Sequence, residues 1–408
     1  MKTKLMKDLR DSLSENIVLC GRDELGQRNR LISKCNIAAT FSNADFDSIS
    51  NIMKIKKNSK QVSIVLGDGA IAKWSSVLSG AGLRYGKDFI DAMSFERIVA
   101  RMEGYQCPKE LVVAYGNCQM HDYFDCLNRT TSFVAKYESA YFKYSEYPRW
   151  QEDYMDLQLI LANIFLYTRE SFDARFRNPI DFIKANNPEC RIIEIPCYSF
   201  RGYFPQTNPH VQEKSRFDIV QEIFNSFHRE DCFINKEILQ GKSTKEIQSD
   251  VLSGKTFQPE EIQRLLDLSL KQLSMMDRVS AIKVSDYVRA NYAQKRLFKD
   301  PVHMEDDLVW YLTMQILDLL SCDKPSEPAG RTVHYFTELP IYPEVAKQLG
   351  LEWWHPELKY DLRMAEGMLK ISTAEYIRRY IQFSANVNEI QKSLHINEGD
   401  AETVSEWF

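Results

Sequence analysis

The chain has 408 residues, which is too long for one ordinary hydrophobic core and predicts two or three domains. Its 44% hydrophobic and 27% charged residues are typical of a globular protein, and its formal charge of -5 argues against a general nucleic-acid binder, which carries a basic stripe. The nine cysteines form no CxxC pair, and neither a long apolar run nor a secretory signal is present. We therefore expect a cytoplasmic, bacterial-type protein with free thiols, no metal and no membrane span.

The first hundred residues alternate short apolar runs with helix-length segments. The apolar runs "NIVLC", "NIAATF" and "QVSIVL" begin at Asn16, Asn36 and Gln61. This alternation is typical of βαβ units and a parallel sheet. It predicts a small Rossmann-like accessory domain over residues 1–105.

The first glycine turn of this domain, Gly21 to Gly26, resembles the dinucleotide fingerprint G-x-G-x-x-G. Asp45 follows at the distance of a ribose-binding acid. However, Asp23 replaces the middle glycine, and its carboxylate would repel a pyrophosphate and block close approach of the backbone. A nicotinamide oxidoreductase is therefore the weakest of the alternatives.

A second α/β pattern follows a polar linker at Arg101–Glu110. The segments "LVVAYG", "ANIFLY" and "CRIIEI" predict buried strands, and they predict a second α/β domain over residues 106–408. Apolar residues at helical spacing predict a helical cap over about 215–296 and C-terminal helices over about 360–395. The predicted fold class is α/β with large helical additions.

The corner after "LVVAYG" carries a lone cysteine, Cys118, in the run "GNCQ". Gly116 permits a tight turn, and the free N–H groups of a following helix favour a thiolate or an oxyanion. Asn117 and Gln119 are the polar neighbours that we expect to complete this turn. The alternative is that Cys118 is an ordinary buried small hydrophobe.

A candidate base lies far downstream, where Asp300 and His303 form a D-x-x-H unit. This spacing lets an aspartate orient an imidazole through one ring nitrogen while the other faces a nucleophile. The alternative for Asp300 is an N-cap of the next helix, with Pro301 at the first helical position. His121 and His210 are rival bases.

Four segments resemble, in order, those of the WcbI-like acetyltransferase family of polysaccharide biosynthesis. They are "LVVAYGNCQ", "IPCYSFRGYFPQTNPH", "VSDYVRANYAQKRLFKDPVH" and "LPIYPEVAKQLGL", and they lie between Glu110 and Leu351. The resemblance implies an SGNH-hydrolase-like core, coenzyme A binding and acyl transfer to a sugar hydroxyl. Cys118 then corresponds to the motif cysteine and His303 to the late histidine. Met304 replaces an expected proline, and the polar residue that often ends the "ANIFLY" strand is here Thr168.

Two further groups of residues are candidates for binding. Cations near the predicted site would hold the phosphates of coenzyme A, and residues of the glycine- and proline-rich loop would contact a sugar or adenine. The alternatives are a solvated charged face and a loop pinned to its core. The cations are Arg129, Lys295, Arg296 and Lys299, and the loop residues are Tyr198, Gly202, Tyr203 and His210.

The predicted function is coenzyme A-dependent O-acetyl transfer to a sugar hydroxyl in capsular or other surface polysaccharide biosynthesis. The partners would be acetyl-CoA and a glycan or nucleotide-sugar acceptor. Two alternatives stay open. One is an SGNH-like esterase or deacetylase, in which water is the acceptor. The other is a non-catalytic scaffold of glycan assembly. The sequence predicts no oligomeric state.

Overall fold

The computed structural model describes residues 16–20, 36–41, 46–58, 62–67, 71–104, 106–143, 149–168, 178–207, 227, 231–327, 337–364 and 367–393. The chain divides into two compact units. The first comprises Met1–Ile195 and Cys322–Lys324, and the second comprises Pro196–Ser321 and Pro325–Phe408.

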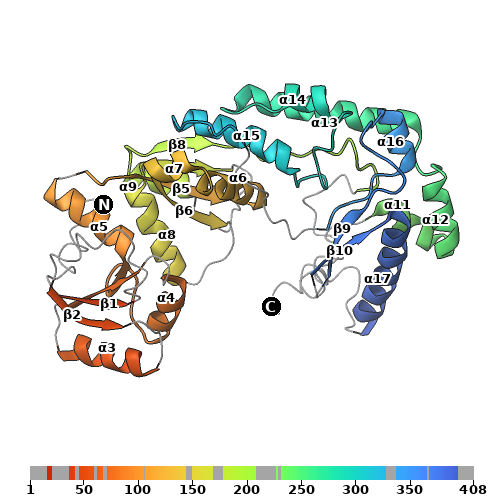
Figure 1. Cartoon of the computed structure of the whole chain (residues 1–408). Helices are drawn as coiled ribbons and strands as arrows, with labels where there is room; N and C mark the ends of the chain where they lie inside the picture. The colour runs from red at the N-terminus through yellow and green to blue at the C-terminus, as the bar shows by residue number, and fades with distance from the viewer. Residues whose placement is uncertain are drawn as a thin grey trace. The chain divides into compact units, whose positions relative to one another are not determined.

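The first unit begins with a four-stranded parallel sheet of order β2-β1-β3-β4 (Figure 1). The predicted parallel sheet of the N-terminal region is therefore confirmed. The predicted dinucleotide turn, with Asp23, and Asp45 lie outside the described residues. The elements are β1 Asn16–Cys20, β2 Asn36–Phe41, α3 Phe46–Asn58, β3 Val62–Leu66, α4 Ile71–Gly80, β4 Phe89–Asp91 and α5 Ala92–Glu103.

A second four-stranded parallel sheet, of order β6-β5-β7-β8, completes the first unit. All three strands predicted after the linker are present as β5, β7 and β8. Strand β5 is buried along almost its whole length, which explains its continuous apolar run. The elements are β5 Glu110–Gly116, α6 Cys118–Asn128, α7 Thr131–Lys136, β6 Tyr137–Lys143, α8 Arg149–Leu161, β7 Ile164–Tyr167, α9 Pro179–Asn186 and β8 Arg191–Glu194.

One hydrophobic core joins the two sheets, because helices α5 and α8 pack against each other. Arg101, in the predicted linker, belongs to α5 and donates to the carbonyls of Ile160 and Leu161 in α8, each at 3.1 Å. The two sheets fall on either side of the predicted boundary at 105/106, yet they share this core and one compact unit. That domain boundary stays a prediction.

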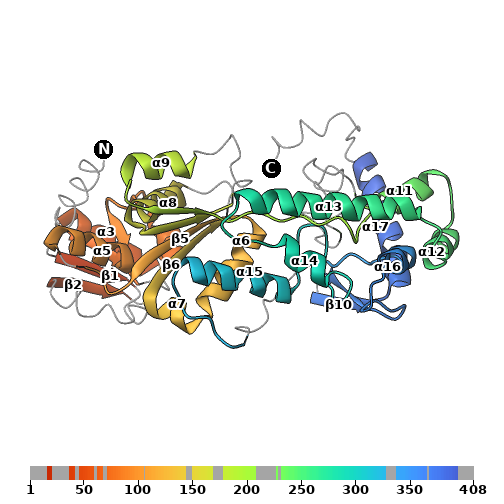
Figure 2. The ribbon, with the colours of Figure 1, turned by 90° about the horizontal axis from the view of Figure 1, so that it is seen from above.

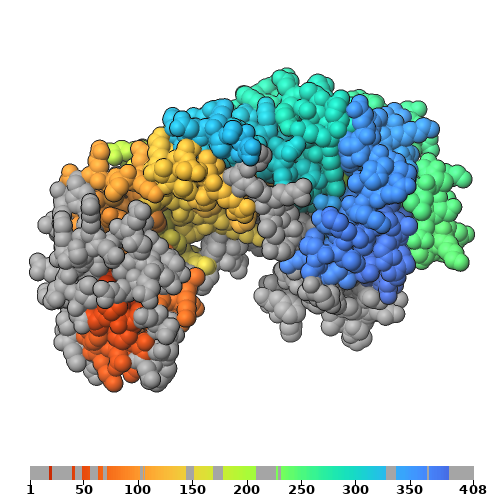
Figure 3. All heavy atoms as spheres, viewed as in Figure 1, coloured from red at the N-terminus to blue at the C-terminus, as the bar shows by residue number. Residues whose placement is uncertain are grey.

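The second unit is mainly helical. Helix α13 packs against α14 and α16, and α12 packs along α17; Figure 3 shows the atoms of α12 in green and of α17 in dark blue. In the predicted helical region 215–296, the described residues from 231 onwards form helices α11 to α14 joined by short turns. The helices are α11 Cys232–Leu239, α12 Thr244–Leu252, α13 Pro259–Val279, α14 Ser285–Asn291, α15 Asp306–Leu319, α16 Pro343–Leu349 and α17 Thr373–Ser393.

The prediction of helices over about 360–395 is wrong for its first part. Strands β9 (Tyr360–Met364) and β10 (Gly367–Ile371) form an antiparallel hairpin, and only α17 is helical there. Tyr360 and Leu362 are buried while the intervening Asp361 is partly exposed, which is a period of two. Gly367 adopts a φ of 130°, which a residue with a side chain rarely adopts. Across the described residues, no helix combines the length and the apolar character that crossing a bilayer requires.

Candidate active site

Cys118 is the first residue of α6 and follows directly on the end of β5 at Gly116. Only glycine fits at position 116. A Cβ atom there would lie 2.6 Å from the Cβ of Met120 and 2.7 Å from the Oγ1 of Thr168. The predicted tight strand-to-helix corner is thus present, and Thr168, at the end of β7, closes it on one side.

The strand order places this corner at a special point of the sheet. The chain leaves β5 for β6 on one side and then crosses to β7 and β8 on the other side. Ligands of open parallel sheets bind outside the carboxyl ends of the strands, where the order reverses in this way. Figure 2 shows α6 following β5 at this end. Cys118 therefore occupies the position that this topology favours for chemistry.

Fewer backbone N–H groups are available to a ligand at the N-terminus of α6 than the sequence predicted. The Oδ1 atom of Asn117 accepts hydrogen bonds from the backbone N–H groups of Gln119 at 3.1 Å and Met120 at 3.4 Å. The side chain of Gln119 is fully buried. Among the described residues, the N–H of Cys118 has no hydrogen-bond acceptor. Cys118 is partly exposed, so its own N–H is the donor available to a bound oxyanion.

Sequence reasoning missed two residues of strand β6. Tyr141 pairs with Ala114 and Lys143 with Gly116 in the parallel register of β5 and β6. The hydroxyl of Tyr141 donates to the carbonyl of Gly116 at 3.2 Å and of Asn117 at 3.0 Å. Only the long-range pairing of β6 with β5 brings these residues to the corner, so no local sequence pattern predicts their position there.

His121, a rival base, lies three residues after Cys118 on the same helix. Its side chain is 62% exposed, and its ring meets that of Tyr141 edge-on with centroids 5.4 Å apart. A hydrogen bond with Asp122 raises the pKa of His121. His121 therefore stays an alternative to His303.

Asp300 and His303 form a buried pair in the second unit. The Nδ1 atom of His303 lies 2.5 Å from the Oδ2 atom of Asp300, as the D-x-x-H spacing predicts. The other carboxylate oxygen accepts from the backbone N–H groups of Val302 at 2.7 Å and His303 at 2.8 Å. The alternative role of Asp300 as a helix N-cap is wrong, because α15 begins at Asp306 and its N-cap is Glu305.

Met304, at the position of the expected proline, is fully buried, and its backbone forms an isolated antiparallel β-bridge with Phe298. The loop from Phe298 to Met304 is thus closed on itself, and Asp300 fixes its turn. The structure brings Asp300 and His303 together within the second unit. Cys118 belongs to the first unit, so its pairing with His303 stays a prediction.

Each of the four predicted phosphate-binding cations lies near at least one carboxylate. Arg129 pairs with Asp125 at 2.8 Å, and Lys295 pairs with Asp307 at 3.0 Å. The Nζ atom of Lys299 lies 3.6 Å from the carboxylate of Asp306 and 3.7 Å from that of Glu305.

Arg296 differs from the other three cations in its two close ion pairs, although Lys299 is buried as deeply. Arg296 bonds Glu305 at 3.2 Å and Glu338 at 3.0 Å. Although burial lowers the pKa of Arg296, these two carboxylates raise it above the ordinary value. This surrounding favours a structural role for Arg296, whereas phosphate binding by the other three stays a prediction.

Three of the four loop residues predicted to contact substrate have structural roles in the core. Tyr198 and Tyr203 are fully buried, and their hydroxyls donate to the carbonyls of Ile282 at 3.1 Å and Tyr292 at 2.7 Å. A Cβ atom on Gly202 would lie 2.8 Å from the ring of Phe200, so glycine is required by packing. These contacts pin the loop to its core and correct the expectation that the two tyrosines stack on a substrate. His210 lies outside the described residues.

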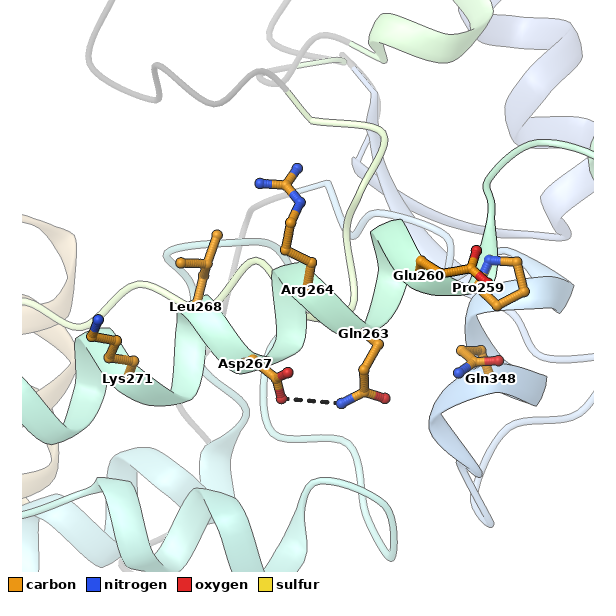
Figure 4. Close-up of a pocket in the computed structure, with 8 residues that line it drawn as sticks. All are labelled: Pro259, Glu260, Gln263, Arg264, Asp267, Leu268, Lys271 and Gln348. Carbon is orange, nitrogen blue, oxygen red and sulfur yellow. Dashed lines mark hydrogen bonds between the residues drawn. The ribbon is translucent and has the colours of Figure 1, made fainter.

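A groove of about 570 Å³ runs along the outer face of α13. Figure 4 shows Arg264, Leu268 and Lys271 projecting from one side of the helix, while Asp267 bonds Gln263 on another. None of the predicted site residues lines this groove. Across the described residues, no group of three or more His, Cys, Asp or Glu side chains could hold a metal ion.

The match to a protein family covers the elements that carry these residues. The family described as polysaccharide biosynthesis enzyme WcbI matches residues 111–325, more than half of the chain. The chain belongs to the WcbI family. The matched region contains Cys118, Asp300 and His303. The fourth resembling segment, which begins at Leu339, lies beyond it.

A solved WcbI structure shares the fold. It covers 71% of this chain and 96% of its own length, with 14% sequence identity and a TM-score of 0.52. That protein is described as a novel polysaccharide biosynthesis enzyme, in a native form without a disulfide bond between coenzyme A and one of its cysteines. At this identity the likeness shows the fold alone. A comparison with curated proteins finds no match.

Proposed function

We propose that this WcbI-family chain is a coenzyme A-dependent O-acetyltransferase that acylates a sugar hydroxyl during the synthesis of a capsular or other surface polysaccharide. Family membership supports a role in polysaccharide biosynthesis. Coenzyme A is named with a cysteine of the solved relative, which supports coenzyme A as the donor here. The acceptor would be a glycan or a nucleotide sugar, and the reaction would take place in the cytoplasm.

The position of Cys118 is the observation that carries this proposal. It begins a helix at the switch point of a parallel sheet, and its N–H has no acceptor among the described residues. A thiolate there would attack the thioester carbonyl, and the N–H of Cys118 would donate a hydrogen bond to the developing oxyanion. The exchange of one thioester for another costs little free energy.

The second half of the reaction needs a base for the sugar hydroxyl. In the proposal, Asp300 holds Nδ1 of His303, so that Nε2 takes the hydroxyl proton as the sugar oxygen attacks the acyl carbon. The bond from the acyl carbon to Cys118 Sγ then breaks, and the thiolate is restored. In a direct-transfer variant, His303 activates the sugar for attack on acetyl-CoA itself, and Cys118 only shapes the oxyanion site.

The fit of coenzyme A to this chain rests on Cys118 and on four cations, of which Lys299 is buried. Arg129 and Lys143 belong to the same unit as Cys118, and Lys143 is paired in register with Gly116. Lys295 and Lys299 belong to the same unit as His303. We propose these four as contacts for its phosphates. Arg296 is omitted because it bonds its two carboxylates at 3.2 and 3.0 Å, whereas Lys299 lies 3.7 and 3.6 Å from its own.

We also propose that residues 1–105 form a Rossmann-like domain and that residues 106–408 carry an SGNH-like core. Both sheets have the parallel order 2-1-3-4 in their own strand numbering, which is the order of doubly wound α/β folds. This strand order supports a doubly wound α/β fold for both domains. It is common to Rossmann-like and SGNH-like folds and so does not distinguish them.

The proposal is tested by comparing donors. The chain is incubated with acetyl-CoA or with an aryl acetate, with and without sugar acceptors, and free coenzyme A and free acetate are measured. A transferase releases coenzyme A faster when an acceptor is present. Equal release of acetate from both donors, with no effect of acceptor, would indicate an esterase. Neither product would indicate a scaffold.

A further inference from the structure

We propose that Tyr141 is a positioning residue that aims the backbone N–H of Cys118 at the oxyanion of an acyl group. This inference rests on the proposed acyl chemistry of Cys118. It assigns to the neighbouring strand β6 a role in that chemistry.

The hydrogen bonds of Tyr141 fix two successive peptide planes. Its hydroxyl reaches the carbonyl oxygens of Gly116 at 3.2 Å and Asn117 at 3.0 Å. No peptide bond among the described residues is cis, so each N–H points away from the carbonyl of its own peptide. The carbonyl of Asn117 and the N–H of Cys118 belong to one such peptide. Holding that carbonyl on the Tyr141 side therefore turns the N–H of Cys118 to the opposite side.

The hydroxyl is not needed merely to satisfy the backbone. The carbonyl of Asn117 already accepts the first helical hydrogen bond, from the N–H of His121 at 3.1 Å. One hydroxyl proton shared between two carbonyls adds little stability. The effect of the Tyr141 hydroxyl is therefore on the orientation of the Asn117–Cys118 peptide.

The ring of Tyr141 is itself held in place. It packs against His121, with centroids 5.4 Å apart, and against Phe124 at 5.6 Å, and both residues belong to α6. Its backbone is fixed by the register of β6 beside β5. A rigid ring between a strand and a helix is a suitable support for a corner that must keep one orientation.

Two reagents separate this role from a general structural one. p-Nitrophenyl acetate acylates a thiolate: Sγ bonds to the carbonyl carbon, an oxyanion forms, and p-nitrophenolate leaves with the electron pair of its C–O bond while the thiol proton goes to water. Iodoacetamide alkylates the same sulfur by displacing iodide and forms no oxyanion. Only the first reaction uses the N–H of Cys118.

The experiment measures both rates at Cys118 by peptide mass spectrometry in the full-length chain. The variants are Tyr141→Phe and the control Tyr137→Phe, which changes a tyrosine four residues earlier on the same strand. The exposed Cys232 is the internal reference. We expect Tyr141→Phe to slow acylation about tenfold, as for a misaligned oxyanion donor, and to leave alkylation within about twofold. Tyr137→Phe should change neither.

Three outcomes would overturn the inference: an equal fall in both rates, unchanged acylation in Tyr141→Phe, or wild-type acylation at Cys118 no faster than at Cys232. Because neither reagent contains coenzyme A, the two proposals fail separately. A chain that ignores acetyl-CoA but shows the expected rates would lose the proposed donor and keep the role of Tyr141.

Discussion

Asp300 contacts His303 through both of its carboxylate oxygens. One accepts a hydrogen bond from the backbone N–H of His303 at 2.8 Å, and the other lies 2.5 Å from ring Nδ1. A single buried carboxylate thereby fixes both the main chain and the imidazole. The side chain of His303 can rotate only by breaking this contact.

Replacing Asp300 by Asn tests whether the ring orientation matters for catalysis. The amide oxygen can still accept from the turn, but the amide nitrogen cannot accept from Nδ1, so the tautomer and position of the ring change. We expect acetyl-CoA turnover with an acceptor to fall about a hundredfold or more, by analogy with triads of this kind. Urea unfolding should show a small loss of stability. Asp307→Asn, on the exposed first turn of α15, is the control and should keep its activity. Equal activity in both variants would remove Asp300 from the mechanism.

Gly116→Ala should damage the corner itself. The new methyl group would meet Met120 at 2.6 Å and Thr168 at 2.7 Å, so the helix start or β7 must shift. We expect the free energy of unfolding to fall by about 1–3 kcal/mol, together with a loss of Cys118 acylation. In Gly80→Ala, at the end of α4, the methyl group meets nothing within 4 Å, and its stability should be equal or higher. Similar stabilities for the two variants would mean that the corner is more tolerant than its packing indicates.

Arg296→Met separates a structural arginine from a phosphate ligand. The substitution removes the cation of Glu338 and leaves Glu305 with only Lys299 at 3.7 Å, and it should cost about 3–5 kcal/mol of stability. Lys295→Met removes an exposed pair with Asp307 and the contact of Nζ with the Tyr287 ring at 5.1 Å, and it should cost about 1 kcal/mol or less. Chemical unfolding of both variants measures these changes. A stable Arg296→Met protein with weakened coenzyme A binding would restore Arg296 to the site.

Glu344, in the first turn of α16, predicts a pH dependence of stability. Both carboxyl oxygens are buried, and burial raises the pKa of Glu344 to about 7 against the opposing effect of the nearby backbone N–H groups of Glu344, Phe257 and Thr256. Because the folded pKa exceeds that of the unfolded chain, this group stabilises the fold below about pH 4.5, and its contribution is lost as the pH rises towards about 7. Burial also raises the pKa of Asp231 to about 7, and its contribution has the same sign.

Glu344→Gln should therefore raise the melting temperature by about 3 °C at pH 8 and by less at pH 5. Thermal unfolding across this range makes the measurement. Glu357→Gln, whose side chain is 81% exposed, is the matched control and should give the wild-type profile. A gain at pH 5 as large as at pH 8 would show that Glu344 is not the titrating group.

The sequence predicted those features that depend on neighbouring residues. Apolar runs bounded by turns located β1, β5, β7 and β8, and the D-x-x-H spacing located the contact between Asp300 and His303, which are three residues apart. Gly116 and Cys118 were found because a strand must end and a helix must begin there.

Features that depend on distant pairing were not predictable in this way. Strand order decides that Cys118 lies at a switch point and that Tyr141 reaches Gly116 and Asn117. Burial decides that Tyr198 and Tyr203 pack in the core, although their aromatic character also suits a ligand. The hairpin of β9 and β10 was mistaken for helix because its apolar residues are too few to separate a period of two from one of 3.6.

The most direct test of the account is intact-protein mass spectrometry after brief incubation with acetyl-CoA. Wild type is compared with Cys118→Ala and His303→Ala. The account predicts an acetyl adduct on wild type that Cys118→Ala lacks, and an adduct on His303→Ala that persists because the second half-reaction is blocked. Coenzyme A binding without any adduct would leave direct transfer as the route. No adduct on any variant, together with no thermal shift from coenzyme A, would contradict the central claim that Cys118 handles an acyl group carried by coenzyme A.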